Sequence, residues 1–199
     1  MKRIVLVRHG ESEWNAARRL QGQADIGLSE RGRTQARALA PMVAALAPTL
    51  VLTSDLQRAR DTASLLGYPD ARPEALLREQ SVGIWTGEAI DGLKAGAPED
   101  YRAWRAGTFA PEGAEDWATF CQRIDRALAL ALADGADTAL VVCHGGVIRA
   151  ALDLCLRLEP ARLIPVGPAS LTVLAFPDGS ARLEAFNVAA RTLELDAPD

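Results

Sequence analysis

The chain has only two histidines, His9 and His144, and each lies just beyond a short apolar run and precedes a glycine. Arg8 stands directly before His9, and Arg58 lies one helical turn beyond the polar triplet at residues 53–55. A histidine among arginines is a poor metal ligand because cations repel cations, but it is a reasonable nucleophile toward phosphate. Nearby positive charge disfavours imidazolium, so the ring stays neutral near pH 7. The pattern therefore indicates phosphoryl transfer in which arginines hold the phosphoryl oxygens.

The polar clusters follow apolar runs that are typical of strands buried on both faces. These runs cover residues 4–7, 50–52 and 139–142, and each is followed by a turn and a helical pattern. This alternation predicts βα units around a largely parallel sheet. Ligands of open α/β sheets bind beyond the carboxyl ends of the strands, so we expect both histidines and at least two arginines in one crevice. Backbone N–H groups at the starts of the following helices favour an anion there.

Capping residues indicate where the helices begin and end. Ser29 is expected to cap a helix that runs through about residue 47, with a kink at Pro41. Ser54 or Asp55 is expected to cap a second helix that ends at Gly67. Apolar residues at helical spacing predict two more helices, one near residues 117–132 and one from about residue 146 to 158.

The region from residue 86 to 116 is glycine-rich, and we expect only one short helix in it, around residues 99–105. It holds seven acidic and three basic residues, so it carries as much net negative charge as the whole chain, which is −4. We interpret it as an insertion or lid within a single domain that spans residues 1–199. Later in the chain, residues 170–176 and 182–188 flank a Pro-Asp-Gly-Ser turn and predict a hairpin.

The composition argues against several classes of protein. Hydrophobic residues make up 49% and charged residues 24% of the chain, as in ordinary globular domains. The net charge of −4 argues against a non-specific nucleic-acid binder. No apolar run approaches the roughly 18 residues of a membrane span, and we expect a cytoplasmic protein without a membrane partner. Three cysteines without CxxC spacing argue against a disulfide framework or a zinc knuckle.

Six segments in order resemble the histidine phosphatase superfamily, the phosphoglycerate-mutase-like proteins. The first, RHGESEWN at residues 8–15, closely resembles the signature of that superfamily. The others are LQGQAD at 20–25, LSERG at 28–32, TSDLQRARDTA at 53–63, LREQ at 77–80 and VCHGGVI at 142–148. The resemblance spans most of the chain, and within the superfamily the sequence is similar to the short bacterial phosphatase branch. It implies a three-layer α/β/α sandwich with a mostly parallel sheet and one antiparallel edge strand.

The resemblance also implies a role for each matching residue. His9 is expected to be the nucleophile that becomes phosphohistidine, and Glu79 the acid that protonates the leaving oxygen. The remaining residues are expected to complete the phosphate pocket (Arg8, Arg58, His144 and the backbone N–H of Gly145) or to line its mouth (Asn15, Gln21 and Gly22). The predicted reaction is metal-independent hydrolysis of a phosphomonoester, with no cofactor.

Two other functions stay open within this resemblance: phosphoglycerate mutase-type phosphoryl transfer, and a non-catalytic member that binds a phosphorylated ligand. Mutases of the family are longer, with a larger insertion after the acid and an ordered C-terminal tail. The modest 86–116 segment and the acidic end over residues 191–199 therefore favour hydrolysis. A silent binding protein typically lacks the nucleophile or the acid, whereas this sequence keeps both. No GxSxG motif occurs, which excludes a serine esterase with a nucleophile elbow.

The substrate is predicted to be a small-molecule phosphomonoester. Because the 86–116 segment is acidic, it is a poor neighbour for polyanions, which favours an ester whose remainder is neutral or cationic. A sugar phosphate or a nucleoside-like phosphate fits, including the α-ribazole phosphate used by some short bacterial relatives. A homodimer stays open, since the sequence does not indicate the oligomeric state.

Overall fold

One mixed sheet forms the centre of the computed structural model, which describes residues 1–133 and 135–190. Its strands lie in the order β3-β2-β4-β1-β5-β6. Their bounds are β1 (Lys2–Arg8), β2 (Leu50–Thr53), β3 (Arg72–Pro73), β4 (Thr138–Cys143), β5 (Ser170–Phe176) and β6 (Arg182–Ala189). The first four run parallel to one another, as the alternation of apolar runs and helical patterns predicted.

The predicted hairpin is β5 and β6, and it forms one edge of the sheet. β5 pairs antiparallel with both β1 and β6. The sequence placed a single antiparallel strand at the edge itself; the structure places that strand, β5, one position further in. The reason is the tight turn, because a hairpin returns its second strand on the outer side of the first. The α/β class and the mostly parallel sheet are confirmed.

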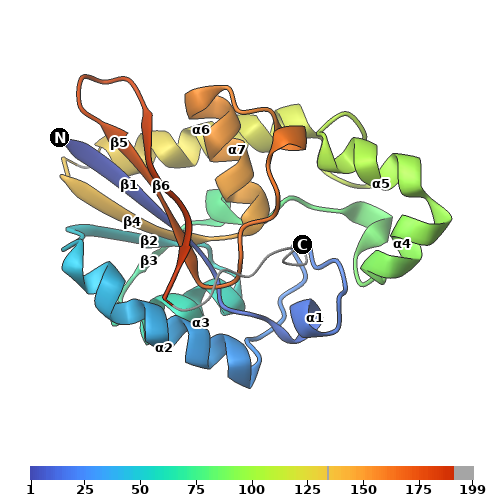
Figure 1. Cartoon of the computed structure of the whole chain (residues 1–199), viewed down its shortest axis with the longest axis horizontal. Helices are drawn as coiled ribbons and strands as arrows, with labels where there is room; N and C mark the ends of the chain where they lie inside the picture. Colours follow the sequence, from blue (N-terminus) through green and yellow to red (C-terminus); the bar gives the residue numbers. More distant parts are fainter. Residues whose placement is uncertain (134, 191–199) are drawn as a thin grey trace.

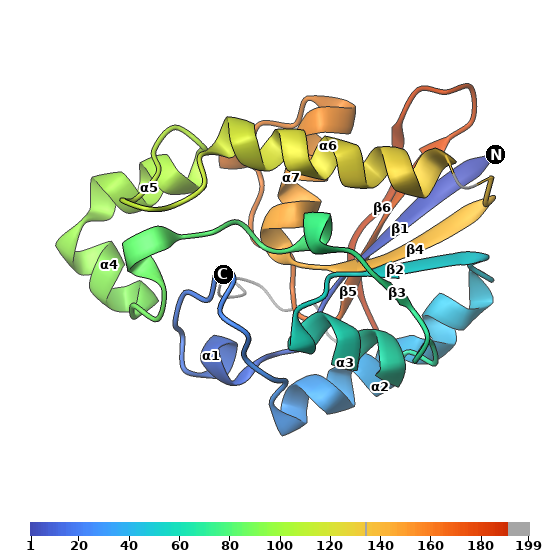
Figure 2. The same cartoon turned by 180° about the vertical axis from the view of Figure 1, so that it is seen from behind.

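Helices cover both faces of the sheet (Figures 1 and 2). On one face lie α2 (Glu30–Ala45) and α3 (Gln57–Leu65), and on the other α6 (Trp117–Ala133) and α7 (Gly145–Leu156). Alternate residues of β1 face the two layers: Ile4 and Leu6 belong to the core with α6 and α7, and Val5 and Val7 to the core with α2 and α3. Burial on both faces explains the unbroken apolar runs.

The helix caps were predicted correctly in one case and wrongly in the other. The Ser29 side chain accepts a hydrogen bond from Gly32 N at 3.0 Å and caps α2, which contains Pro41. At α3 neither Ser54 nor Asp55 caps the helix; the acceptor for Gln57 N is Asp25 Oδ1 at 2.6 Å, from a distant loop. Ser54 contacts His144 instead, and Asp55 forms an ion pair with Arg78, so both side chains have other partners.

The 86–116 segment holds two helices, α4 (Ile90–Gly96) and α5 (Pro98–Arg105), where the sequence predicted one. Glycines at positions 92 and 96 weaken the helical signal of α4. Packing compensates, because Ile90 is buried in a small apolar cluster with Leu20, Val82, Trp85, Tyr101 and Trp104. This cluster holds α4 and α5 to one side of the sheet (Figure 1). Among the described residues, none of the helices has the length and apolar character needed to cross a bilayer.

Candidate active site

The carboxyl ends of three neighbouring strands bring the two histidines together. Arg8, at the end of β1, pairs in register with Cys143 at the end of β4. Thr53, at the end of β2, pairs with Val142 of β4. His9 and His144 are therefore the first residues beyond two adjacent strands. Their ring centroids lie 5.1 Å apart, with 62° between the ring planes.

His9 is held as a neutral ring with one nitrogen free to react. Its Nδ1 lies 2.7 Å from the carbonyl oxygen of Gly10. A carbonyl only accepts, so Nδ1 carries the hydrogen and Nε2 carries the lone pair. Burial lowers the pKa of His9 well below its usual value, and the positive charges of Arg58 and Arg8 lower it further. The side chain is therefore an unprotonated nucleophile at neutral pH.

His144 is fully buried beside His9, and its Nε2 lies 2.8 Å from Ser54 Oγ. Its Nδ1 has no hydrogen-bond partner among the described residues. Burial lowers the pKa of His144 well below its usual value, and the positive charge of Arg58 lowers it further. A neutral His144 can donate one hydrogen bond to an anion without adding a further charge to the site.

Two arginines project into the same cleft as His9. Arg58 is 1% exposed and donates to the carbonyls of Gly22 at 2.8 Å and Ala24 at 2.7 Å. Its Nε has no partner among the described residues, and burial lowers its pKa to about 10. Arg8 is also buried and donates to the carbonyl of Val166. Two buried guanidinium groups beside a nucleophile form a cradle for phosphoryl oxygens.

The carboxylate of Glu79 is held by two backbone N–H groups, one at the start of α7 and one from the residue that follows it in the chain. Its Oε2 accepts from Gly146 N at 3.0 Å and its Oε1 accepts from Gln80 N at 2.8 Å. A Cβ atom at Gly146 would lie 2.2 Å from Glu79 Oε1, so only glycine fits there without displacing the carboxylate. Glu79 lines the same cleft as His9, in reach of a group bound between them.

Arg123 fixes the backbone that carries Glu79, and sequence reasoning missed it. Its guanidinium group donates to the carbonyl oxygens of Leu76 at 2.6 Å, Arg78 at 2.8 Å and Glu79 at 3.3 Å. It also pairs with Glu115 at 2.7 Å. Three of these acceptors are main-chain atoms, which carry no signal in the sequence. An arginine on a helix face is otherwise read as a solvated residue.

The residues predicted at the pocket mouth, and Gly145 of the predicted phosphate pocket, lie in different places. Gln21, Gly22 and Gly145 line the cleft. Asn15 does not contribute to the wall that the described residues form; its Oδ1 accepts from Ser12 N at 3.2 Å and completes a capping box at the short helix α1 (Glu13–Ala16). Seven of the nine predicted residues thus line the cleft, His144 lies directly beside His9, and Asn15 lies in the supporting layer.

The cleft continues past the phosphate cradle and has a volume of about 700 Å³, including the part open to solvent. The 86–116 segment contributes Trp104 and Arg105 to its wall, and α7 contributes Arg149. None of the seven acidic residues of that segment lines the cleft. The expectation that this segment repels anions is therefore wrong at the cleft, because its acidic side chains lie on outer faces or, for Glu115, in an ion pair.

Within residues 1–133 and 135–190, no three His, Cys, Asp or Glu side chains gather in a way that could hold a metal ion. The cationic groups at the cradle are those of arginines. The arrangement can therefore bind a phosphoryl group between Arg8, Arg58 and the start of α7, and present it to His9 Nε2.

Comparison with known proteins agrees with this geometry. Residues 4–189 match the family model of the histidine phosphatase superfamily (branch 1). The chain is 38% identical over 190 residues to a glucosyl-3-phosphoglycerate phosphatase of Mycobacterium tuberculosis, covering 87% of this chain and 85% of that protein. A solved mycobacterial glucosyl-3-phosphoglycerate phosphatase in complex with VO3 superposes with a TM-score of 0.88 at 35% identity, covering 95% of this chain and 100% of the other. A probable phosphoglycerate mutase GpmB of Photorhabdus laumondii is 46% identical over 96 residues, 47% of this chain and 45% of that protein.

Proposed function

Because this chain belongs to branch 1 of the histidine phosphatase superfamily, we propose that it hydrolyses a glycosylated phosphoglycerate of the glucosyl-3-phosphoglycerate kind through a phosphohistidine at His9. It is a phosphoric monoester hydrolase of that superfamily. The observation that carries the residue assignment is the tautomer of His9. Its Nδ1 is bound to the Gly10 carbonyl, so Nε2 carries the lone pair, and burial together with the positive charges of Arg58 and Arg8 lowers the pKa of the ring.

The first half of the reaction forms the phosphohistidine. Arg8 and Arg58 hold the phosphoryl oxygens, together with His144 and the N–H of Gly145. Nε2 of His9 attacks phosphorus as the bond from phosphorus to the alcohol oxygen breaks. Glu79 donates its proton to that oxygen, so the alcohol leaves neutral.

The second half releases phosphate. A water molecule attacks phosphorus, and Glu79, now a carboxylate, accepts its proton. The bond between phosphorus and Nε2 breaks, which restores the neutral ring and leaves inorganic phosphate. Dividing the hydrolysis into two displacements lets the same cradle stabilise both.

The choice of alcohol is supported by the similarity to the glucosyl-3-phosphoglycerate phosphatase, which extends over 87% of this chain. It is also supported by the extent of the cleft, whose wall continues beyond the phosphate cradle to Trp104, Arg105 and Arg149. The α-ribazole phosphate considered from the sequence stays a competing substrate in the test. So does 3-phosphoglycerate, because the mutase relative matches 46% over 96 residues. The acidic end that argued against a mutase, residues 191–199, lies outside the described residues.

The test is steady-state release of inorganic phosphate in the presence of EDTA. The substrates are glucosyl-3-phosphoglycerate, 3-phosphoglycerate, α-ribazole phosphate, sugar phosphates and p-nitrophenyl phosphate, and 3-phosphoglycerate is also assayed for conversion to 2-phosphoglycerate. We expect the highest kcat/KM for glucosyl-3-phosphoglycerate and no turnover by His9→Ala. Turnover by His9→Ala would remove the proposed nucleophile, and isomerisation without phosphate release would establish the mutase alternative.

A further inference from the structure

The cleft holds more positive charge than the transfer of one phosphoryl group uses. Four arginines line it, and Glu79 is the one carboxylate among the described residues of its wall. Two of those arginines, Arg8 and Arg58, flank His9 in the phosphate cradle. The other two, Arg105 and Arg149, come from α5 and α7 and lie along the extension of the cleft.

Arg149 is positioned along the helix that begins at the phosphate cradle. It lies three residues beyond Gly146 and four beyond Gly145, so all three share one face of α7. Its Cα atom is therefore displaced from the start of α7, at the cradle, by about one helical turn, ~5.4 Å along the axis. That separation is comparable to a few covalent bonds, the distance between a phosphate ester and a second functional group on a short carbon chain.

The guanidinium group of Arg149 is held by two tryptophan rings. Its central carbon lies 4.9 Å from the ring centroid of Trp117 and 5.8 Å from that of Trp104. Trp117 is itself fixed by a hydrogen bond from its Nε1 to Asp153 Oδ2 at 2.9 Å. Arg149 is only 6% exposed, so its planar fork is oriented before any ligand arrives. Orientation of this kind lowers the entropy that binding must overcome.

A third donor lies in the same wall. Trp104 is 4% exposed and lines the cleft, and its Nε1 has no hydrogen-bond acceptor among the described residues. A buried N–H without an acceptor is costly, which is explained when a ligand supplies the acceptor. Next to it, Arg105 donates to the carbonyl of Leu163 at 3.5 Å. The wall thus carries two cationic groups and one neutral N–H without an acceptor, a combination that suits an anionic or strongly accepting group.

We propose that Arg149, Arg105 and Trp104 Nε1 form a second anion subsite, which binds a carboxylate on the alcohol part of the substrate and makes the enzyme selective for acid-bearing phosphomonoesters. This inference rests on the proposed function, since it extends the same cleft. It reverses the preference for neutral or cationic alcohols that the composition of the 86–116 segment suggested.

A matched pair of esters tests the subsite. 3-Phosphoglycerate carries a carboxylate where glycerol 3-phosphate carries a hydroxymethyl group, and phosphate release from both is measured. We expect the wild type to favour 3-phosphoglycerate in kcat/KM by about tenfold or more, the usual effect of hydrogen bonds to a charged group. Arg149→Gln should lose about tenfold on 3-phosphoglycerate, mainly in KM, and less than about twofold on glycerol 3-phosphate, with Arg149→Lys in between.

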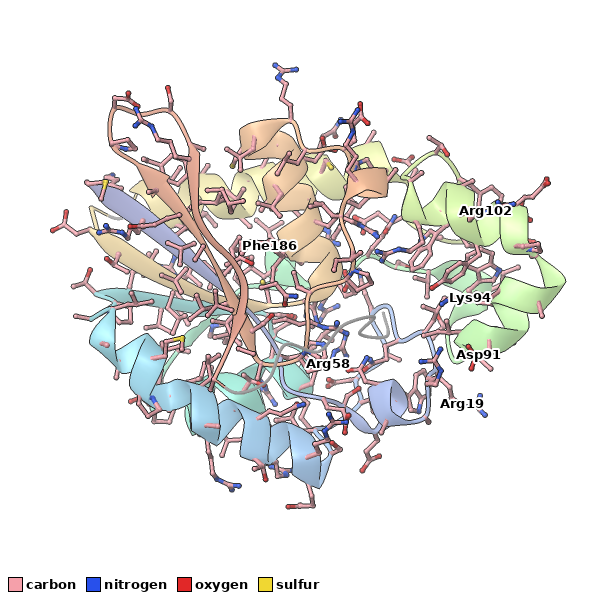
Figure 3. All side chains as sticks on the ribbon, in the orientation of Figure 1. Arg19, Arg58, Asp91, Lys94, Arg102 and Phe186 are labelled. Carbon is pink, nitrogen blue, oxygen red and sulfur yellow. The ribbon has the colours of Figure 1, made fainter. Side chains whose placement is uncertain are left out.

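Control variants separate this role from a general loss of structure. Arg102→Gln removes the same charge from the exposed side of α5, at the periphery of the molecule and far from the central Arg58 (Figure 3), and should leave both rates unchanged. Trp104→Phe removes one donor while keeping an aromatic ring, and Arg105→Gln alters the less buried arginine. If Arg149→Gln does not fold, these two variants must still reduce the preference for 3-phosphoglycerate. Equal losses on both esters, or no preference in the wild type, would overturn the subsite.

Binding measured without turnover distinguishes the subsite from the proposed function. Calorimetric titration of the His9→Ala protein with the two esters should show tighter binding of 3-phosphoglycerate by about tenfold. If the wild type releases no phosphate but this preference in binding persists, the hydrolytic assignment of this site fails and the subsite stands. If phosphate is released and both esters bind equally, the subsite alone fails. Binding of neither ester overturns both.

Discussion

Replacing Gly146 by alanine should displace the proposed acid while leaving the fold intact. The added Cβ would lie 2.2 Å from Glu79 Oε1 and 3.0 Å from its Cδ. The first distance is about 1.2 Å short of an ordinary van der Waals contact, so the carboxylate must move by roughly that amount. The helix itself does not resist the change, because alanine is favoured over glycine in a helix by about 1 kcal/mol. The displacement is therefore concentrated on the side chain of Glu79.

The size of the kinetic effect follows from that displacement. Misplacing a reacting group by about 1 Å costs on the order of 10²-fold, or ~2.7 kcal/mol in the transition state. We expect this loss in kcat/KM with an alkyl phosphate, whose alcohol must be protonated as it leaves. With p-nitrophenyl phosphate the leaving oxygen needs no acid, so the loss should be well below tenfold. The assay is phosphate release from both substrates at one pH.

Two further variants make the result specific. Gly145→Ala adds the same methyl one residue earlier, where its nearest neighbour is Arg8 Nε at 3.7 Å, and it should cost far less on the alkyl ester. Glu79→Asp in the Gly146→Ala background shortens the acid and makes room, so the two changes should be strongly non-additive. A Gly146→Ala protein with the wild-type rate on the alkyl phosphate would refute the reasoning. Equal losses on both substrates would show that the substitution disturbs the phosphate cradle and not the acid.

Four other predictions follow from buried and half-buried groups. The low pKa values of His9 and His144 mean that both rings should stay neutral well below pH 6.5; NMR of the two imidazoles in the phosphate-free protein checks this, and a midpoint near 6.5 for His9 would contradict it. For the same reason the unfolded chain takes up protons that the folded chain does not, so the free energy of unfolding should fall as the pH drops below about 6.5. Arg123→Gln should lower kcat and reduce the free energy of unfolding in urea by about 2 to 3 kcal/mol, because Glu115 loses its partner; unchanged kcat would separate Arg123 from the acid. Full or partial burial raises the pKa of all three thiols, that of Cys121 to about 11, so the native protein should react slowly with Ellman's reagent at pH 8, and a fast thiol would contradict the raised pKa values of Cys121, Cys143 and Cys155.

The parts of the fold that the sequence predicted are those with local signals. Strands buried on both faces are unbroken apolar runs, and both β1 and β4 show this pattern. The meeting of His9 and His144 followed from topology, because the carboxyl ends of adjacent parallel strands lie at one edge. The short helix α1 and the two-residue strand β3 were missed, since each is too short for a hydrophobic period to develop.

The parts that could not be predicted depend on partners far away in the sequence. α3 begins where Asp25 accepts from Gln57 N, and the two positions are 32 residues apart. Arg123 reaches main-chain oxygens 44 to 47 residues away. A carbonyl oxygen is present at every position, so the residue type does not show which carbonyl will accept a hydrogen bond. Such contacts become visible only when the chain is folded.

The 86–116 segment shows why the charge of a segment is a poor guide to the charge of a site. Its net charge is negative, and the sequence therefore suggested that it would repel anions. Most of its acidic side chains lie on outer faces, however, while Trp104 and Arg105 turn toward the cleft. Helices α4 and α5 are amphipathic, and their packing on one apolar cluster determines which side chains face inward. A substrate meets only that inner face, so the contribution of the segment to the cleft depends on Trp104 and Arg105 and not on its overall composition.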